Sequence, residues 1–168
     1  MAFAMNANAQ DKGHFTVNAN FGSVCTVGGF GLGVGYQKTI FEKNDWELAW
    51  DIVHFEWDAP FKSPADLDYI NIRSGVRGFT PSFANGKLRA YTNFDLGYTL
   101  VITETITFSY DKYGFPTDYK TKKKAYSAFG LQFGAGFQWN KKISLGYTLQ
   151  YETKFKSKNH LATIAYTF

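Results

Sequence analysis

The sequence predicts an all-β fold, an eight-stranded antiparallel up-and-down barrel whose strands cross a membrane. Extended runs alternate between two faces: in residues 46–54, Trp46 and Trp50 share an apolar face, while Glu47 and Asp51 lie on the other. Runs of about ten residues with this period fit a bilayer core of roughly 30 Å when the strands are tilted. No stretch reaches 18 consecutive apolar residues, which excludes a transmembrane helix on length. Because an open sheet edge would leave backbone groups unpaired in lipid, the sheet has to close.

The composition fits a single domain of this kind. The chain has 168 residues, and aromatic residues make up 19% of it, more than a soluble core of this size needs. The mean hydropathy is nevertheless negative, at -0.28, a combination that suits a barrel better than a helical membrane protein. The net charge of +4 would permit nucleic-acid binding, but no helix-turn-helix, zinc or RNP-like pattern accompanies it. Nucleic acid is therefore not a predicted partner.

The N-terminal residues predict export. Residues 1–9 end in Ala7, Asn8 and Ala9, a site of the kind that signal peptidase cuts, so we interpret them as the tail of a signal peptide. Residues 10–168 then form the barrel domain, and the expected location is a bacterial outer membrane. The single cysteine, Cys25, lies in a glycine-rich turn and has no partner for an internal disulfide, which leaves its role open.

Eight alternating runs are separated by gaps that are short and long in turn. We predict strands at 13–22, 29–40, 45–56, 68–79, 88–102, 124–139, 143–155 and 160–168. The connections rich in Asn, Gly, Pro and Lys would be tight periplasmic turns: 41–44, 80–87 and 140–142. The other connections would face the cell exterior, as the longer loops of outer-membrane barrels do: 23–28, 57–67, 103–123 and 156–159.

The face that would meet lipid carries no charge over the expected membrane band. It includes Phe15, Val17 and Phe21 in the first strand and Ile164 and Tyr166 in the last. A Lys or Arg at the midplane of such a face would cost roughly 2–4 kcal/mol. Chance is therefore a poor explanation for the pattern.

The opposite face points into the barrel and mixes small residues with charges. Its charged residues are four acids and four bases: Glu47, Asp51, Asp95 and Glu152, with Arg73, Arg77, Arg89 and Lys154. Because unpaired charge is costly in a narrow lumen, we expect layers of hydrogen-bonded ion pairs. The pairs best matched in height are Asp51–Arg73 and Glu47–Arg77. An eight-stranded barrel is only wide enough for its own side chains, so we predict a polar plug that does not conduct.

The basic residues that give the chain its positive net charge lie mainly near the predicted outer rim. Six lysines flank two of the outward connections: Lys120, Lys122, Lys123, Lys124, Lys156 and Lys158. Lipopolysaccharide carries phosphates at this height, so we expect these lysines to bind it, each contributing roughly 1 kcal/mol before salt screening. A solvated collar that simply ends the strands is the alternative interpretation.

The last predicted strand alternates to its end, and it finishes on Phe168 with Tyr166 two positions before it. This segment resembles the C-terminal signal by which the outer-membrane assembly machinery recognises barrel substrates. Together with eight strands, short periplasmic turns and inward-facing glycines, it makes the chain similar to the small outer-membrane β-barrel family that includes the OmpA transmembrane domain, OmpX and OmpW. The resemblance implies an integral outer-membrane protein, with the assembly machinery and outer-membrane lipids as partners.

Two classes of function follow from the surface loops and the rim. The preferred one is a non-enzymatic surface barrel, structural or partner-binding, because residues 103–123 alternate Thr with β-branched or aromatic residues and predict a protruding hairpin. Its exposed edge could accept a strand from a protein partner. The second is an enzyme that acts on lipid A, which needs a serine activated by a histidine. The candidates near the rim are His54 and His160, both expected on the lipid-facing side of their strands, with Ser157 or Ser63 nearby in loops.

A third function is OmpW-like passage or binding of small hydrophobic molecules. It needs an apolar upper lumen, and the residues expected at the extracellular mouth are Phe55, Trp57, Tyr69, Tyr126 and Leu161. These side chains could equally form a packed lid. No metal-ligand spacing, phosphate-binding glycine loop or dinucleotide fingerprint is present, so the sequence predicts neither a metal site nor a cofactor.

Overall fold

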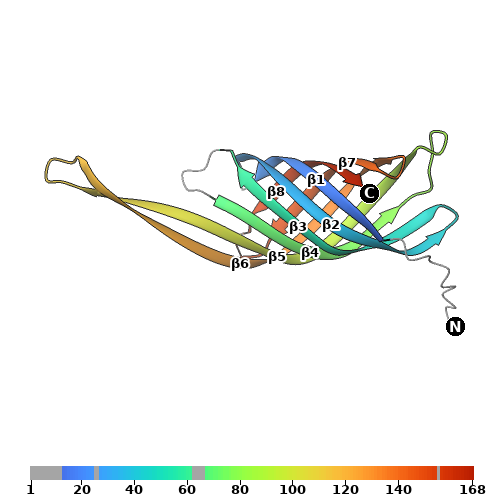
Figure 1. The fold of residues 1–168 in the computed structure, drawn as a ribbon, viewed down its shortest axis with the longest axis horizontal. Helices are drawn as coiled ribbons and strands as arrows, with labels where there is room; N and C mark the ends of the chain where they lie inside the picture. The colour runs from blue at the N-terminus through green and yellow to red at the C-terminus, as the bar shows by residue number, and fades with distance from the viewer. Residues whose placement is uncertain (1–12, 25–26, 62–66, 155) are drawn as a thin grey trace.

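The computed structural model describes residues 13–24, 27–61, 67–154 and 156–168, and these form eight β-strands (Figure 1). The strands are β1 (Gly13–Val24), β2 (Val27–Lys43), β3 (Trp46–Pro60), β4 (Leu67–Phe79), β5 (Leu88–Tyr110), β6 (Pro116–Trp139), β7 (Ile143–Glu152) and β8 (Lys158–Thr167). Over these described ranges, no helix is long and apolar enough to cross a membrane. The predicted signal peptide at residues 1–9, Cys25 and Ser63 lie outside the described residues.

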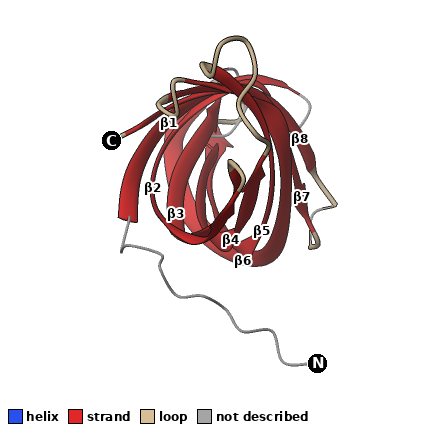
Figure 2. Ribbon diagram, turned by 90° about the vertical axis from the view of Figure 1, so that its right-hand side faces the viewer, coloured by secondary structure: helices blue, strands red, loops and turns tan. Residues whose placement is uncertain are grey.

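Each strand pairs antiparallel with the next one along the chain, and β1 closes the sheet on β8. The closing seam runs from Thr16 opposite Thr167 to Ser23 opposite His160. Figure 2 shows the resulting ring of strands. Closure removes the open sheet edges that lipid does not tolerate. The predicted fold class, an eight-stranded up-and-down barrel, is confirmed.

Tight turns join the strands at one end of the barrel. Asn44 and Asp45 connect β2 to β3 with φ angles of 50° and 62°, and Asn140 and Lys141 follow β6 with 50° and 57°. Two consecutive residues in the left-handed region are typical of the hairpin turns whose twist matches that of the strands, and Asn tolerates this region well. The predicted connections 80–87 and 140–142 agree with the structure, whereas the one predicted at 41–44 is displaced, because β2 continues to Lys43 and the turn is Asn44 and Asp45.

The β5–β6 hairpin is longer than the predicted strands 88–102 and 124–139, and it projects far beyond the rest of the barrel (Figure 1). Strand β4 pairs with β5 only as far as Thr103, so the hairpin continues for seven more residues, roughly 24 Å at the rise of a strand. Asp111 closes the tip, because its Oδ1 accepts from the backbone N–H groups of Tyr113 (2.8 Å) and Phe115 (2.9 Å).

A β-bulge in β3 inserts one extra residue between Asp51 and His54, and it interrupts the pairing with β2 and with β4. The extra residue reverses the alternation. His54 therefore points into the lumen, while Phe55 and Trp57, 47% and 37% exposed, face outward. The Ser74 hydroxyl donates to the Asp51 carbonyl (2.9 Å) beside the bulge. The predicted lipid-facing position of His54 and the predicted mouth positions of Phe55 and Trp57 are wrong, because they assumed unbroken alternation.

The outward face of the barrel is apolar and exposed, with Phe15, Tyr98 and Leu145 among its large side chains. Inside, several glycines make room for side chains from the neighbouring strands, and Gly31 and Gly134 are two of them. A Cβ atom on Gly31 would collide with the carboxylate of Asp58, and one on Gly134 would collide with the amide of Asn93. The inner surface is consequently polar and closely packed, which is the reverse of a soluble barrel.

Candidate functional site

Arg89 on β5 organises the layer of charges nearest the tight turns. Its Nη1 donates to Glu47 Oε2 (2.5 Å), and its Nε donates to Gln138 Oε1 (2.8 Å). Thr39 donates to the other Glu47 oxygen (2.9 Å). The guanidinium carbon also lies 3.8 Å from the centre of the Phe79 ring, a cation–π contact. Charge-assisted bonds on several sides hold this layer in one geometry.

The next layer contains one ion pair and one carboxylate bonded by amides. Arg77 Nη2 lies 3.4 Å from Asp51 Oδ2. Asp95 Oδ2 accepts from Asn93 Nδ2 (2.5 Å) and from Gln132 Nε2 (3.3 Å). Because a buried carboxylate needs donors, these amide groups compensate part of the hydration that Asp95 loses.

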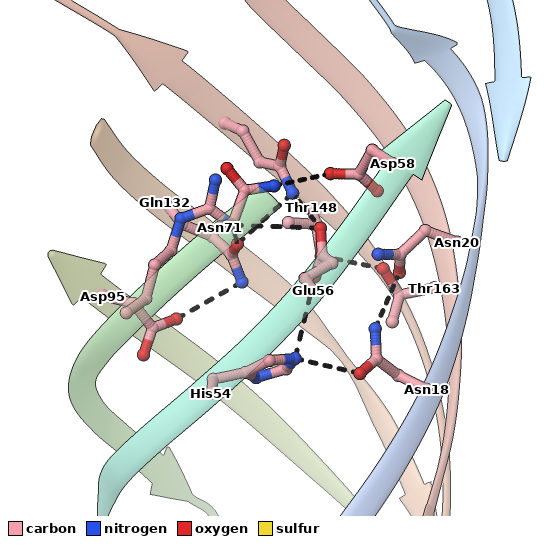
Figure 3. Close-up of polar contacts among 12 residues, drawn as sticks. Asn18, Asn20, His54, Glu56, Asp58, Asn71, Asp95, Gln132, Thr148 and Thr163 are labelled. Atoms are coloured by element: carbon pink, nitrogen blue, oxygen red, sulfur yellow. Dashed lines mark hydrogen bonds and ion pairs between the residues drawn. The ribbon is translucent and has the colours of Figure 1, made fainter. Parts of the chain in front are cut away.

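Arg73, Glu56 and His54 meet near the middle of the lumen. Figure 3 shows His54 and Glu56 close together on the same strand. Arg73 Nη1 lies 3.8 Å from Glu56 Oε1 and donates to the side-chain oxygen of Gln132. His54 Nε2 donates to Asn18 Oδ1 (2.9 Å) and lies 3.7 Å from Glu56 Oε2. The cluster therefore ties β1, β3, β4 and β6 together across the barrel.

Amides and hydroxyls carry the network towards the hairpin end. Gln150 on β7 donates to Glu56. Asn71 Nδ2 donates to Asp58 Oδ2 (2.7 Å), and Asn71 Oδ1 accepts from the Thr99 hydroxyl (2.6 Å). Figure 3 shows Asp58 and Asn71 facing each other above the His54 cluster.

The ion pairs differ from the predicted ones. The observed pairs near the tight turns are Asp51–Arg77 and Glu47–Arg89, so the predicted pairs Asp51–Arg73 and Glu47–Arg77 are wrong. The β3 bulge is one reason, because it places Arg73 opposite His54 and next to Glu56 instead of near Asp51.

The predicted balance of four acids against four bases is also wrong. Glu56 and Asp58 are buried in the lumen and were not predicted, whereas Lys154 is exposed beyond the end of β7, with its ammonium 5.3 Å from the centre of the Tyr126 ring. Over the described residues, the buried charges are five carboxylates and three guanidinium groups: Asp51, Glu56, Asp58, Asp95, Glu152, Arg73, Arg77 and Arg89. The sequence signal for the missed acids was the polar alternation of residues 54, 56 and 58.

Apolar side chains pack across the lumen at the hairpin end. Val24, Tyr69, Val101 and Leu161 form a cluster in which each is at most 3% exposed. The cavity below, lined in part by His54, has about 20 Å³ of space, room for roughly one water molecule. Of the residues predicted at the mouth, Tyr69 and Leu161 therefore form a packed lid.

The histidines and serines considered for catalysis have other partners. His54 bonds Asn18, and the Nδ1 of His160 shares a hydrogen bond with the Tyr147 hydroxyl on the outer face. Ser157 donates to the buried Glu152 (2.9 Å). Among the described residues, neither His54 nor His160 forms a hydrogen bond with a serine. The same residues include no group of three or more His, Cys, Asp or Glu side chains that could bind a metal.

One face of the β5–β6 hairpin carries lysines. Lys120, Lys122 and Lys124 alternate along β6, so their side chains share the face that continues the lumen wall. Their neighbours across the ladder are Thr107, Thr105 and Thr103. All three lysines are exposed, and no ion pair joins them to an acid among the described residues. We call Lys120, Lys122 and Lys124 the lysine face.

The opposite face of the hairpin is aromatic and apolar. Ile106, Phe108, Tyr110 and Tyr119 are each at least 50% exposed there. Lys123 lies on this second face, apart from the other predicted lysines, and forms an ion pair with Glu104 (3.4 Å). The hairpin is thus a two-faced ribbon.

The remaining predicted lysines lie beside the base of the hairpin. Lys156 and Lys158 are exposed at the turn between β7 and β8. The contact of Lys154 with Tyr126 holds this turn next to β6. The two predicted groups of lysines therefore belong to the same side of the rim.

Comparison with known proteins supports the barrel at the level of fold. No family model and no curated protein sequence matches the chain. The N-terminal β-barrel domain of Pseudomonas aeruginosa OprF is similar in structure (TM-score 0.62, 12% identity, covering 95% of this chain and 100% of that domain). Neisserial surface protein A is also similar (TM-score 0.63, 15% identity, covering 92% and 95%).

A third similar structure is Ail, the attachment invasion locus protein of Yersinia pestis, in complex with the heparin analogue sucrose octasulfate (TM-score 0.52, 15% identity, covering 93% and 97%). All three are small outer-membrane β-barrels. The chain therefore shares the fold of the small eight-stranded outer-membrane barrels that its sequence resembles.

Proposed function

We propose that this chain is a non-enzymatic integral protein of a bacterial outer membrane that has a closed lumen and presents the β5–β6 hairpin as a surface for binding. The observation that carries the proposal is the hairpin itself, which stands roughly 24 Å clear of β4 and bears three exposed lysines on one face. A barrel that served only to span the membrane would not need such an extension.

The ligand we propose for the lysines is the phosphate of lipopolysaccharide. Successive lysines on one face of a strand are about 6.8 Å apart, so several phosphates could be met at once. Lys156 and Lys158 extend this basic surface at the base of the hairpin. Ail, a barrel of the same fold, has been crystallised with a sulfated sugar, and a sulfated sugar is likewise a polyanion.

The test replaces Lys122, Lys124, Lys156 and Lys158 together with Gln. We expect the variant to retain less lipopolysaccharide than the wild type after extraction at low salt, and the difference to shrink at high salt because screening weakens phosphate contacts. The matched control replaces Lys87, Lys141 and Lys142, which lie in the turns at the opposite end. Equal retention by the quadruple variant and the wild type at low salt would refute the lipopolysaccharide assignment.

The closed lumen is supported by the layers of side chains that fill it. Arginine–carboxylate pairs, amide networks and the lid of Val24, Tyr69, Val101 and Leu161 leave room for about one water in the cavity beside His54. We expect planar-bilayer recordings of the wild-type protein to show no steady conductance. A large and steady current would overturn this part of the proposal.

A second candidate function is docking of a protein strand on the hairpin. Among the described strands, residues 104–110 and 116–128 have only one neighbour each, so their outer backbone groups have no ladder partner in this part of the chain. Such edges accept extended peptides from other proteins. A photo-crosslinker at position 119 in intact cells should then give a discrete protein adduct, whereas one at Leu145 on the lipid face should not. Matching patterns at the two positions would argue against a hairpin partner.

A further inference from the structure

The two free edges of the β5–β6 hairpin differ in charge. Residues 104–110 of β5 and 116–128 of β6 each have one neighbour among the described strands. The β6 edge carries one acid and four lysines, whereas Glu104 is the one charged residue of the β5 edge, and it is paired with Lys123 of the same hairpin (3.4 Å). Charged residues, above all lysines, keep a sheet edge from pairing with another chain. The β6 edge is therefore protected, and the β5 edge is not.

The β5 edge has the composition and the backbone geometry to accept a further strand. Residues 105–110 include no charge, proline or glycine, and they are rich in the β-branched and aromatic residues that favour strands. The Ala90 carbonyl accepts from the N–H of Thr80, which follows β4 (2.9 Å), so the backbone groups of the even-numbered residues of β5 point away from β6. Pairing with β6 keeps its register until the last residue of β5. Ile106 and Phe108 therefore present their N–H and C=O groups on the free edge.

The hairpin also has apolar surface left to bury. Ile106, Phe108 and Tyr110 lie on its aromatic face and are each at least 50% exposed. A ribbon of two strands is marginally stable in water, whereas three or more strands with a shared apolar face can be stable. The hairpin should therefore gain stability from a strand that adds to its open edge.

The β5 edge is complementary to itself. It begins where the pairing with β4 ends and stops at the tip, and its seven residues centre on Thr107. A two-fold axis at Thr107 therefore places all seven residues opposite those of a second copy, in antiparallel order. Each Ile106 then faces a Phe108 across the seam and exchanges backbone hydrogen bonds with it. A β-branched residue opposite an aromatic one is a favourable cross-strand pair.

The lysines do not oppose this pairing. Lys120, Lys122 and Lys124 belong to β6, which is the strand remote from the seam. The lysines of the two copies are then three strand spacings apart, roughly 14 Å, against a Debye length of about 8 Å at physiological ionic strength. The protected β6 edges are left outermost in the four-stranded sheet, so the assembly closes at two copies.

We propose that the β5 edge is a homophilic contact, which pairs with the β5 edge of a second copy, antiparallel and centred on Thr107. The inference rests on the hairpin being a binding surface, as given under the proposed function, and it names a second copy as the strand that docks there. The lysine face stays free for phosphate. Because the two hairpins point in opposite directions, the two barrels lie at opposite ends of the pair. The contact therefore joins copies in two facing membranes, with roughly 48 Å along the strands between Leu100 of one copy and Leu100 of the other.

Disulfide trapping on the full chain in a mild detergent tests the register, with Cys25→Ser as the background. In the proposed pair, Thr107 meets its own copy at a position without hydrogen bonds between the two residues, where the Cα atoms are about 4.5 Å apart, within the range that a disulfide spans. Ser109, on the same face of the same strand, would lie roughly 14 Å from its copy. We expect Thr107→Cys to form a covalent dimer at least about tenfold faster than Ser109→Cys. Equal rates would overturn the proposal, because a parallel pair or random collisions treat the two positions alike, and so would the absence of a dimer from Thr107→Cys.

A second variant tests the edge without a cysteine. Ile106→Lys places a charge on the open edge, as the lysines of β6 do on theirs, and it should weaken association at least about tenfold in sedimentation experiments. Tyr119→Lys is the matched control, because it adds the same charge to the same face of the hairpin but on β6, away from the seam. Gel mobility verifies that both barrels are folded. Equal association of the two variants would contradict pairing through β5.

The outcomes separate this contact from the lipopolysaccharide assignment. If Thr107→Cys stays monomeric while the variant at Lys122, Lys124, Lys156 and Lys158 loses lipopolysaccharide, the self-pairing fails and the proposed function stands. If Thr107→Cys forms the dimer while the lysine variant retains as much lipopolysaccharide as the wild type, the contact stands and the assignment of the ligand fails.

Discussion

The basic side chains of the lumen and those of the hairpin have the same charge but opposite surroundings. In the lumen the bases are Arg73, Arg77 and Arg89, each at most 8% exposed and each bonded to a carboxylate or an amide. On the hairpin they are lysines that reach into solvent. A guanidinium group makes several directed bonds and is weakly hydrated, whereas an ammonium is a strongly hydrated, mobile point charge. The difference indicates which charges hold the barrel and which are free to meet a ligand.

The largest expected effect comes from breaking a lumen pair. Arg77→Ala leaves Asp51 as a buried charge without its ion-pair partner, and it should lower the free energy of unfolding by roughly 3–5 kcal/mol. Urea titration of the folded barrel in detergent, followed by gel mobility, measures the change. The double variant Arg77→Gln with Asp51→Asn should recover part of the loss, because no charge is left unpaired. A loss below 1 kcal/mol for Arg77→Ala would contradict the structural role of the pair.

A second prediction tests the reversed alternation after the bulge. Phe55→Lys places a charge on the face that meets lipid, and it should cost roughly 2–4 kcal/mol if the position lies near the midplane. Phe115→Lys at the tip of the hairpin is the matched control, and it should change stability by less than about 0.5 kcal/mol. If unbroken alternation were correct, Phe55 would face the lumen, and a lysine there would find carboxylates and cost far less.

A third prediction concerns the bulge, whose hydrogen bonds should contribute a smaller part of the free energy of unfolding. Ser74→Ala removes the hydroxyl that donates to the Asp51 carbonyl (2.9 Å) and accepts from Trp50 Nε1 (3.1 Å). Because these groups lie in or beside lipid and have no water to replace the hydroxyl, we expect a loss of roughly 1–3 kcal/mol in the free energy of unfolding. Ser127→Ala, at the base of the hairpin, is the control. Equal effects of the two substitutions would show that Ser74 does not support the bulge.

The smallest effect should come from the hairpin. Lys122→Ala changes an exposed side chain with no ion-pair partner among the described residues, so its effect on stability should lie within about 0.5 kcal/mol. The same urea titration measures it. A destabilisation of 2 kcal/mol or more would show that the lysine face serves folding, and the contrast with the lumen arginines would fail.

The strand count, the tight turns and the lipid face could be predicted from sequence because each is a local pattern with period two. Which of residues 54–58 face the lumen could not be predicted, because Ile52 and Val53 carry no sequence signal of a β-bulge. The pairing of Arg77 with Asp51 could not be predicted either, since it depends on register across β3 and β4.

From the seam between β1 and β8 we also expect an order of assembly. Phe168 N–H donates to the Phe15 carbonyl (2.9 Å), and Val17 faces Tyr166, so the contacts that close the ring join opposite ends of the chain. Contacts of such high sequence separation form late and slowly. Before β8 pairs with them, β1 and β7 have unpaired backbone N–H and C=O groups, and these are costly to place in hydrocarbon. We therefore expect membrane insertion to depend on the pairing of β8 with β1 and β7, and a variant without β8 should accumulate outside the bilayer.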